Sequence, residues 1–131
     1  MIHRGPCVVI DLDGTLTQTK RPEQDYADLV PRRDILDRLQ EYHAAGYHII
    51  IQTARNMRTH EGNLGQINAK TVPVVLDWLA RHEVPYDELH VGKPWCGDGG
   101  FYVDDKAVRP SEFRAMSPAE IAALLADEAA L

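Results

Sequence analysis

Short apolar runs alternate with amphipathic segments along the chain. Residues 7–10 (Cys-Val-Val-Ile) and 49–51 (Ile-Ile-Ile) are continuously apolar. Such runs are typical of strands that are covered on both faces of a sheet. We expect two further short strands at residues 88–91 and 100–103. The pattern therefore predicts four short strands.

Helical spacing marks the segments between and after these runs. Asp34 suits an N-cap, and apolar residues then recur at helical spacing until Gly46 ends the segment. A second helix is expected over residues 72–82. A third begins near residues 117–120 (Ser-Pro-Ala-Glu), which have the form of a capping box with proline in the first turn. Residues 17–33 and 56–70 lack clear periodicity and are expected to be loops.

The order strand, helix, strand, helix, strand, strand, helix predicts an α/β protein. We expect one Rossmann-like domain over residues 1–131, with three layers, a mainly parallel sheet and helices on both faces. The length of 131 residues fits one domain. The loop at 56–70 is long for a simple connection, which favours a functional role.

Composition and charge argue against several classes of function. The net charge of −6 argues against broad nucleic-acid binding, because the phosphate backbone repels an acidic surface. No apolar run approaches the length of a membrane span, and no signal peptide precedes the first strand. Cys7 and Cys96 form no CxxC pair, so a zinc site is not expected. We expect a cytoplasmic protein that binds neither nucleic acid nor membrane.

Polar residues stand at the ends of the four predicted strands: Asp11, Thr53, Lys93 and Asp104. In parallel α/β sheets, ligands bind beyond the carboxyl ends of the strands. A carboxylate can attack a phosphoester only where the negative charges of the phosphate are neutralised. Mg²⁺, a lysine and a hydroxyl can do this together. The strand ends therefore suit phosphoryl transfer through an aspartyl-phosphate.

Four segments resemble the motifs of the haloacid dehalogenase (HAD) superfamily, in the order of that family. The first is Asp11-Leu12-Asp13-Gly14-Thr15-Leu16-Thr17, and the others are Thr53, Lys93 in Gly-Lys-Pro and Asp104-Asp105 in Tyr-Val-Asp-Asp. The resemblance covers nearly the whole chain. It implies a Mg²⁺-dependent phosphatase rather than a dehalogenase, because an aspartate stands at position 13.

The resemblance also implies a role for each residue. By this resemblance, Asp11 would be the nucleophile and a Mg²⁺ ligand, and Asp13 would be the general acid and base, whose backbone carbonyl would also bind Mg²⁺. Thr53 and Lys93 would hold the phosphoryl oxygens. Asp104 would bind Mg²⁺, directly or through water, with Asp105 in support.

The spacing between these motifs leaves no room for a cap domain. One helix and one strand take up much of the interval from Asp11 to Thr53, and the same holds from Thr53 to Lys93. A site without a cap must stay open or be covered by a neighbouring subunit, which favours a homo-oligomer.

Three residues near the motifs are candidates for substrate binding: Arg55, Asn56 and Trp95. Arg55 and Asn56 follow Thr53 closely and suit a polar or anionic substrate. Trp95 either stacks on the substrate or packs the loop. The segments around these motifs also resemble the small HAD phosphatases found with capsular polysaccharide biosynthesis genes. This narrower resemblance implies a phosphorylated sugar or polyol as substrate. A nucleotide or nucleic-acid-end phosphatase and a non-catalytic phospho-binding domain are the alternatives.

Overall fold

The computed structural model describes residues 4–131 and divides the chain into two compact units. The first ends at Trp95, and the second spans Cys96–Leu131. Each unit is described by itself below. The first contains the sheet, and the second is helical in its regular structure.

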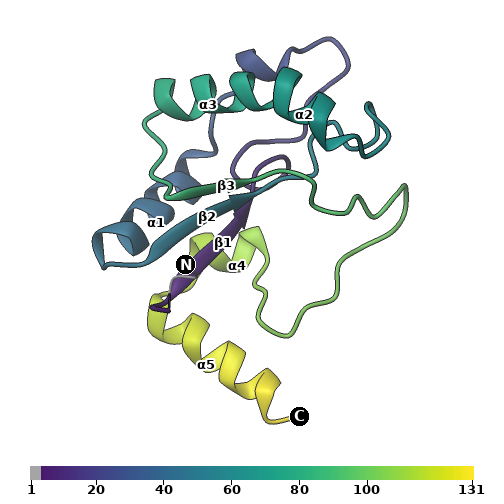
Figure 1. Cartoon of the computed structure of the whole chain (residues 1–131). Helices are drawn as coiled ribbons and strands as arrows, with labels where there is room; N and C mark the ends of the chain where they lie inside the picture. The colour runs from purple at the N-terminus through teal and green to yellow at the C-terminus, as the bar shows by residue number, and fades with distance from the viewer. Residues whose placement is uncertain (1–3) are drawn as a thin grey trace. The chain divides into compact units, whose positions relative to one another are not determined.

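Three parallel strands form the sheet of the first unit, in the order β1-β2-β3. They are β1 (Cys7–Asp11), β2 (His48–Gln52) and β3 (Glu88–His90), and Figure 1 shows them side by side. Asp11 is paired with Gln52, so β1 and β2 end level with one another. Gln52 is paired in turn with His90. The strands expected near residues 7–10, 49–51 and 88–91 are confirmed, and this is a small α/β protein.

The helices of the first unit connect these strands: η1 (Tyr26–Asp28), α1 (Arg33–Ala44), α2 (Leu64–Lys70) and α3 (Val72–Arg81). The helices expected near Asp34 and over residues 72–82 are present. Asp34 is not the N-cap, because α1 begins at Arg33 with Arg32 in the N-cap position, and Asp34 lies in the first turn. The expectation of a loop throughout residues 56–70 was wrong, because α2 occupies its second half. The Asn63 side chain accepts a hydrogen bond from the backbone N–H of Gln66 and caps this helix, and Ile67 is fully buried.

Apolar residues of the strands and helices form the core of the first unit. Ile49 and Ile51 of β2 are fully buried, as are the α1 residues Ile35, Leu36 and Leu39. Full burial of an aliphatic side chain contributes about 1.5–3 kcal/mol. This core fixes the strand ends from which the polar residues project.

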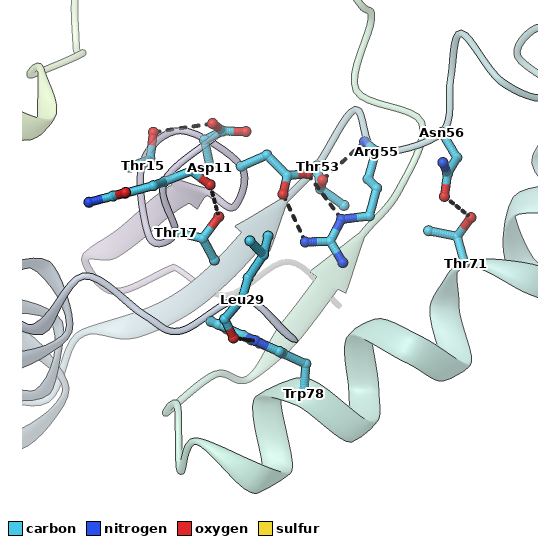
Figure 2. A network of polar contacts seen from close by, with 11 residues as sticks. Asp11, Thr15, Thr17, Leu29, Thr53, Arg55, Asn56, Thr71 and Trp78 are labelled. Carbon is cyan, nitrogen blue, oxygen red and sulfur yellow. Dashed lines mark hydrogen bonds and ion pairs between the residues drawn. The ribbon is translucent and has the colours of Figure 1, made fainter. Parts of the chain in front are cut away.

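Trp78 of α3 ties a surface segment to the core. Its side chain is almost fully buried, and its indole N–H donates a hydrogen bond of 2.6 Å to the backbone carbonyl of Leu29. Leu29 is itself buried and follows η1 directly. The segment at residues 17–33, expected as a loop, is therefore fastened to α3, and Figure 2 shows this contact.

The second unit contains α4 (Pro110–Ala115) and α5 (Pro118–Ala129). The capping box expected at residues 117–120 is confirmed, since Ser117 and Glu120 each accept a hydrogen bond from the other's backbone N–H. The sequence did not predict α4, a short helix at whose start the Glu112 side chain accepts a hydrogen bond from the backbone N–H of Arg109. None of the helices in residues 4–131 is long and apolar enough to cross a membrane.

The strand expected at residues 100–103 is not formed in the described part of the chain. Phe101 and Val103 are largely exposed, and no ladder pairs this segment with another strand. Gly97 and Gly99 precede it with positive φ angles, which turn the chain sharply. The apolar run had indicated a strand, but periodicity cannot show whether a pairing partner is available.

Candidate active site

A tight loop after β1 holds the first two aspartates. Gly14 has a φ of +81°, a conformation that glycine adopts without strain. The backbone N–H of Thr17 donates to the carbonyl of Leu12, which closes the turn. Leu12 and Leu16 are fully buried and anchor both sides of it. Leu12 is therefore directed into the core, between the polar side chains of Asp11 and Asp13.

Asp11 lies between a hydroxyl and an ammonium group. The Thr15 hydroxyl donates a hydrogen bond of 3.1 Å to Asp11 Oδ2 (Figure 2). Lys93 Nζ lies 3.4 Å from Asp11 Oδ1, and both side chains are mostly buried. Burial raises the pKa of Asp11 above its ordinary value of 3.8, while Lys93 and Thr15 act in the opposite direction.

The backbone brings Thr53 and Lys93 to the same edge of the sheet. The Thr53 N–H donates to the carbonyl of His90, at the end of β3, over 2.9 Å. The Lys93 N–H donates to the carbonyl of Thr53 over 3.2 Å. The Thr53 side chain is almost fully buried, and its hydroxyl oxygen accepts a hydrogen bond from the Arg55 N–H. The segments after β2 and β3 are therefore linked at the carboxyl ends of the strands.

Asp13 and Arg55 form an ion pair with two hydrogen bonds. Arg55 Nε donates to Asp13 Oδ2 over 3.0 Å, and Arg55 Nη2 donates to Oδ1 over 2.8 Å. The Arg55 side chain is only 2% exposed, against 26% for Asp13. Arg55 Nη1 is buried and has no hydrogen-bond partner among the described residues. The carboxyl group of Asp13 is thus held from its inner side.

Tyr26 of η1 covers the same guanidinium group. The guanidinium carbon of Arg55 lies 4.1 Å from the centre of the Tyr26 ring, within the range of a cation–π contact. Burial raises the pKa of the Tyr26 hydroxyl, and the negative charge of Asp13 adds to this effect. Arg55 therefore joins three segments, namely the loop after β1, the turn after β2 and η1.

Asn56 and Trp95 have different surroundings. Asn56 has a φ of +61°, and its Oδ1 accepts a hydrogen bond of 2.7 Å from the Thr71 hydroxyl (Figure 2). Trp95 is 44% exposed, and the Arg58 guanidinium lies 5.6 Å from the centre of its ring. Asn56 fastens the loop after β2 to the start of α3, whereas Trp95 is partly exposed and contacts Arg58.

Asp104 and Asp105 belong to the second unit and are both exposed. Asp104 Oδ1 accepts a hydrogen bond of 2.8 Å from the backbone N–H of Lys106, as an aspartate in a turn commonly does. Their expected role as metal ligands stays a prediction.

Five of the residues expected in the site are thus connected within the first unit: Asp11, Asp13, Thr53, Arg55 and Lys93. Sequence reasoning assigned no role to Thr15 or Tyr26. Thr15 could have been found, because it stands one turn after Asp11 in the same motif. Tyr26 lies in a segment without periodicity, and no local signal connects it with Arg55.

The donors at this edge suit a hard cation. Carboxylate and carbonyl oxygens are the ligands that Mg²⁺ prefers, and the Asp11 carboxylate at the end of β1 is of this kind. Within residues 4–131, no three His, Cys, Asp or Glu side chains are grouped so that they could hold a metal ion. Mg²⁺ commonly takes only one or two protein carboxylates and completes its coordination with phosphate oxygens and water.

The fold and site define an α/β protein with a lysine-paired carboxylate beyond its parallel strands. The chain is similar to the crystal structure of an MCSG target from Vibrio cholerae, with 53% sequence identity and a TM-score of 0.90. The similarity covers 95% of this chain and 99% of that one, and the two proteins belong to the same family. Neither a protein-family model nor a curated protein sequence matches the chain.

Proposed function

We propose that the protein is a Mg²⁺-dependent phosphomonoester hydrolase of the HAD superfamily, with Asp11 as its nucleophile. The contact between Lys93 Nζ and Asp11 Oδ1, at 3.4 Å, supports this proposal most directly. An ammonium group beside a partly buried carboxylate keeps a negative nucleophile available and offers a positive charge to the phosphoryl oxygens. A carboxylate that only capped a turn would need no such partner.

The proposed reaction has two steps. In the first, an Asp11 carboxylate oxygen bonds to phosphorus while the bond from phosphorus to the leaving oxygen breaks. Asp13 gives its proton to the leaving oxygen, and the alcohol departs. In the second, the Asp13 carboxylate takes a proton from water, and the water oxygen attacks phosphorus. The bond to Asp11 then breaks, which releases inorganic phosphate and restores both aspartates.

The other residues of the site bind and neutralise the phosphoryl group. Lys93 would offset its charge, and the Thr53 hydroxyl would donate to one of its oxygens. Mg²⁺, when bound, would supply further charge neutralisation. The Asp11 carboxylate and the Asp13 carbonyl would hold it, with Asp104 as a further ligand and Asp105 in support.

The proposed substrate is a small phosphorylated metabolite. The likeness of the motifs to the small capsule phosphatases suggests a sugar or polyol phosphate that serves as a cell-surface polysaccharide precursor. The exposed ring of Trp95, with Arg58 above it, suits a polar ring-shaped substrate, because sugar faces stack on aromatic side chains. Asn56 is a further candidate for substrate contact.

The finer description of the fold belongs to the same proposal. We infer a Rossmann-like arrangement in three layers without a cap domain, and a homo-oligomer that covers the open site. The coarser α/β fold with a parallel sheet is compatible with this arrangement.

Phosphate release tests the proposed function. The purified protein is incubated with an aryl monophosphate, with Mg²⁺ or with EDTA, and released phosphate is measured. Turnover is expected with Mg²⁺ and not with EDTA. After rapid quenching, an acid-stable phosphoryl group is expected on Asp11. A panel of sugar, polyol and nucleotide monophosphates then ranks the substrates. Binding of phosphate esters without turnover on any of them would make the protein a phospho-binding domain and refute the proposal.

A further inference from the structure

We propose that Arg55 is a positioning residue, which orients the carboxyl group of Asp13 for proton transfer to the leaving oxygen. This role rests on the proposed phosphatase function. The sequence alone suggested contact between Arg55 and the substrate. The geometry points instead to an effect that passes through Asp13.

The contact between the two residues restricts the carboxyl group strongly. Two parallel hydrogen bonds, of 3.0 Å and 2.8 Å, fix both the position and the plane of the Asp13 carboxyl group. A single hydrogen bond would leave the group free to rotate. Each carboxyl oxygen has two lone pairs, and Arg55 occupies one on each. The outward side of Asp13, which is 26% exposed, remains available to carry and deliver a proton.

The guanidinium group is itself held rigidly. The Arg55 side chain is 2% exposed, and its guanidinium carbon lies 4.1 Å from the centre of the Tyr26 ring. The backbone N–H of Arg55 also donates a hydrogen bond to the Thr53 hydroxyl. These contacts immobilise the arginine before any substrate binds. Proton transfer requires the donor and acceptor oxygens to lie within hydrogen-bond distance. A carboxyl group that is already fixed does not have to lose orientational freedom when the substrate reacts.

The burial of Arg55 also argues against a purely structural ion pair. Arg55 Nη1 is buried without a hydrogen-bond partner among the described residues, and an unsatisfied buried donor costs free energy. Buried ion pairs contribute little net stability compared with apolar packing. The arrangement is therefore better suited to orienting a reactive group than to stabilising the fold.

The test depends on the leaving group. A poor leaving group, such as the alkoxide of an alkyl phosphate, needs the Asp13 proton, whereas 2,4-dinitrophenolate leaves without it. The value of kcat/KM depends only on the steps up to and including the first irreversible one, here the departure of the alcohol or phenol. It therefore isolates the need for a proton from Asp13. We expect Arg55→Met to lower kcat/KM for the alkyl phosphate by about 10²-fold or more. The loss for 2,4-dinitrophenyl phosphate should be only a few-fold.

A double-mutant cycle identifies the path of the effect. Asp13→Asn should produce the same selective loss, and adding Arg55→Met to it should change kcat/KM little further. Arg55→Lys keeps the charge but loses the paired hydrogen bonds, so it should also remain low on the alkyl phosphate. If Arg55→Met does not fold, Arg55→Lys replaces it in the test. Arg33→Met, which breaks an exposed pair with Asp37 on α1, is the matched control and should leave both substrates unaffected.

Equal losses on both substrates would overturn the positioning role, as would a full additional loss when Arg55→Met is added to Asp13→Asn. Either result would favour direct contact between Arg55 and the phosphoryl group. Normal turnover by the wild-type protein in the same assay would keep the phosphatase proposal intact. An absence of wild-type turnover on both substrates would instead refute the phosphatase proposal, and the role of Arg55 with it.

Discussion

Lys93 and Asp11 are 82 residues apart in the chain, yet Lys93 Nζ lies 3.4 Å from Asp11 Oδ1. The parallel sheet brings them together. Asp11 ends β1, and Lys93 follows β3 and is tied to Thr53 through its backbone N–H. The contact places an ammonium group against a carboxylate in a partly buried environment, where charges interact more strongly than in water.

This contact makes a prediction about the titration of Asp11. Burial raises the pKa of Asp11 above 3.8, and Lys93 limits that rise. The folded protein therefore holds this proton more tightly than the unfolded chain does. The resulting stability is fully present below pH 3.8 and is lost as the pH rises through the folded pKa. The attacking carboxylate, by contrast, is lost as the pH falls through the same pKa.

Substituting Lys93 by Met should raise the pKa of Asp11 further, because the largest lowering influence is removed. Carbon-13 NMR of the Asp11 carboxyl group in metal-free protein measures this directly. Lys70→Met, on α2, serves as the control and should leave the titration unchanged. A wild-type pKa at or below 3.8 would contradict the dominant effect of burial. A pKa that Lys93→Met does not alter would contradict the contact between Lys93 and Asp11.

Asp11→Asn should remove phosphate release while preserving the fold. The amide cannot form an acyl phosphate by the proposed route, yet it keeps the size of the carboxyl group and an oxygen for the Thr15 hydroxyl. Turnover and circular dichroism measured on the same sample separate loss of chemistry from unfolding. Asp37→Asn, on the exposed surface of α1, is the matched control and should retain full activity. Substantial residual turnover in Asp11→Asn would remove Asp11 as the nucleophile.

Hydrophobic periodicity located the strands of the first unit better than it located the elements of the second. Asp11, Thr53, Lys93 and Asp104 were expected together because parallel strands end at one edge of a sheet, and the structure connects the first three of them. The same reasoning failed at residues 100–103, where an apolar run forms no strand in the described part of the chain. Periodicity reports what could be buried, whereas a strand also needs a partner with unpaired backbone groups.

The ion pair between Arg55 and Asp13 illustrates a second limit. Both residues were singled out from the sequence, but with separate roles, because 42 positions separate them and no local pattern connects their side chains. Tyr26 was missed for the same reason. Long-range pairing of side chains depends on how the loops after β1 and β2 approach one another, and only the folded structure shows this.

Metal dependence provides a prediction for the second unit. EDTA should abolish turnover, and added Mg²⁺ should restore it. Asp104→Asn should raise the Mg²⁺ concentration needed for half-maximal activity, because a neutral amide binds a hard cation more weakly than a carboxylate does. Asp105→Asn should have the smaller effect if Asp105 only supports its neighbour. Mg²⁺ titrations of the two variants that coincide with the wild type would remove this pair from the metal site.

Trp78 provides a prediction about stability and the segment at residues 17–33. Trp78→Phe removes the indole N–H, which donates a hydrogen bond of 2.6 Å to the Leu29 carbonyl. The smaller side chain also leaves a small void in the core. We expect the free energy of unfolding to fall by about 1–3 kcal/mol, since a buried carbonyl loses its partner. Leu76→Ala, on an exposed part of the same helix, should cost less than about 0.5 kcal/mol. Urea unfolding followed by circular dichroism measures both values.

Trp78→Phe should also affect the site. Because Leu29 directly follows η1, which carries Tyr26, loss of the hydrogen bond to Leu29 should weaken the contact of Tyr26 with Arg55. Trp78→Phe should therefore show part of the selective loss on alkyl phosphates expected for Arg55→Met, and equal losses on alkyl and activated aryl phosphates would contradict this coupling.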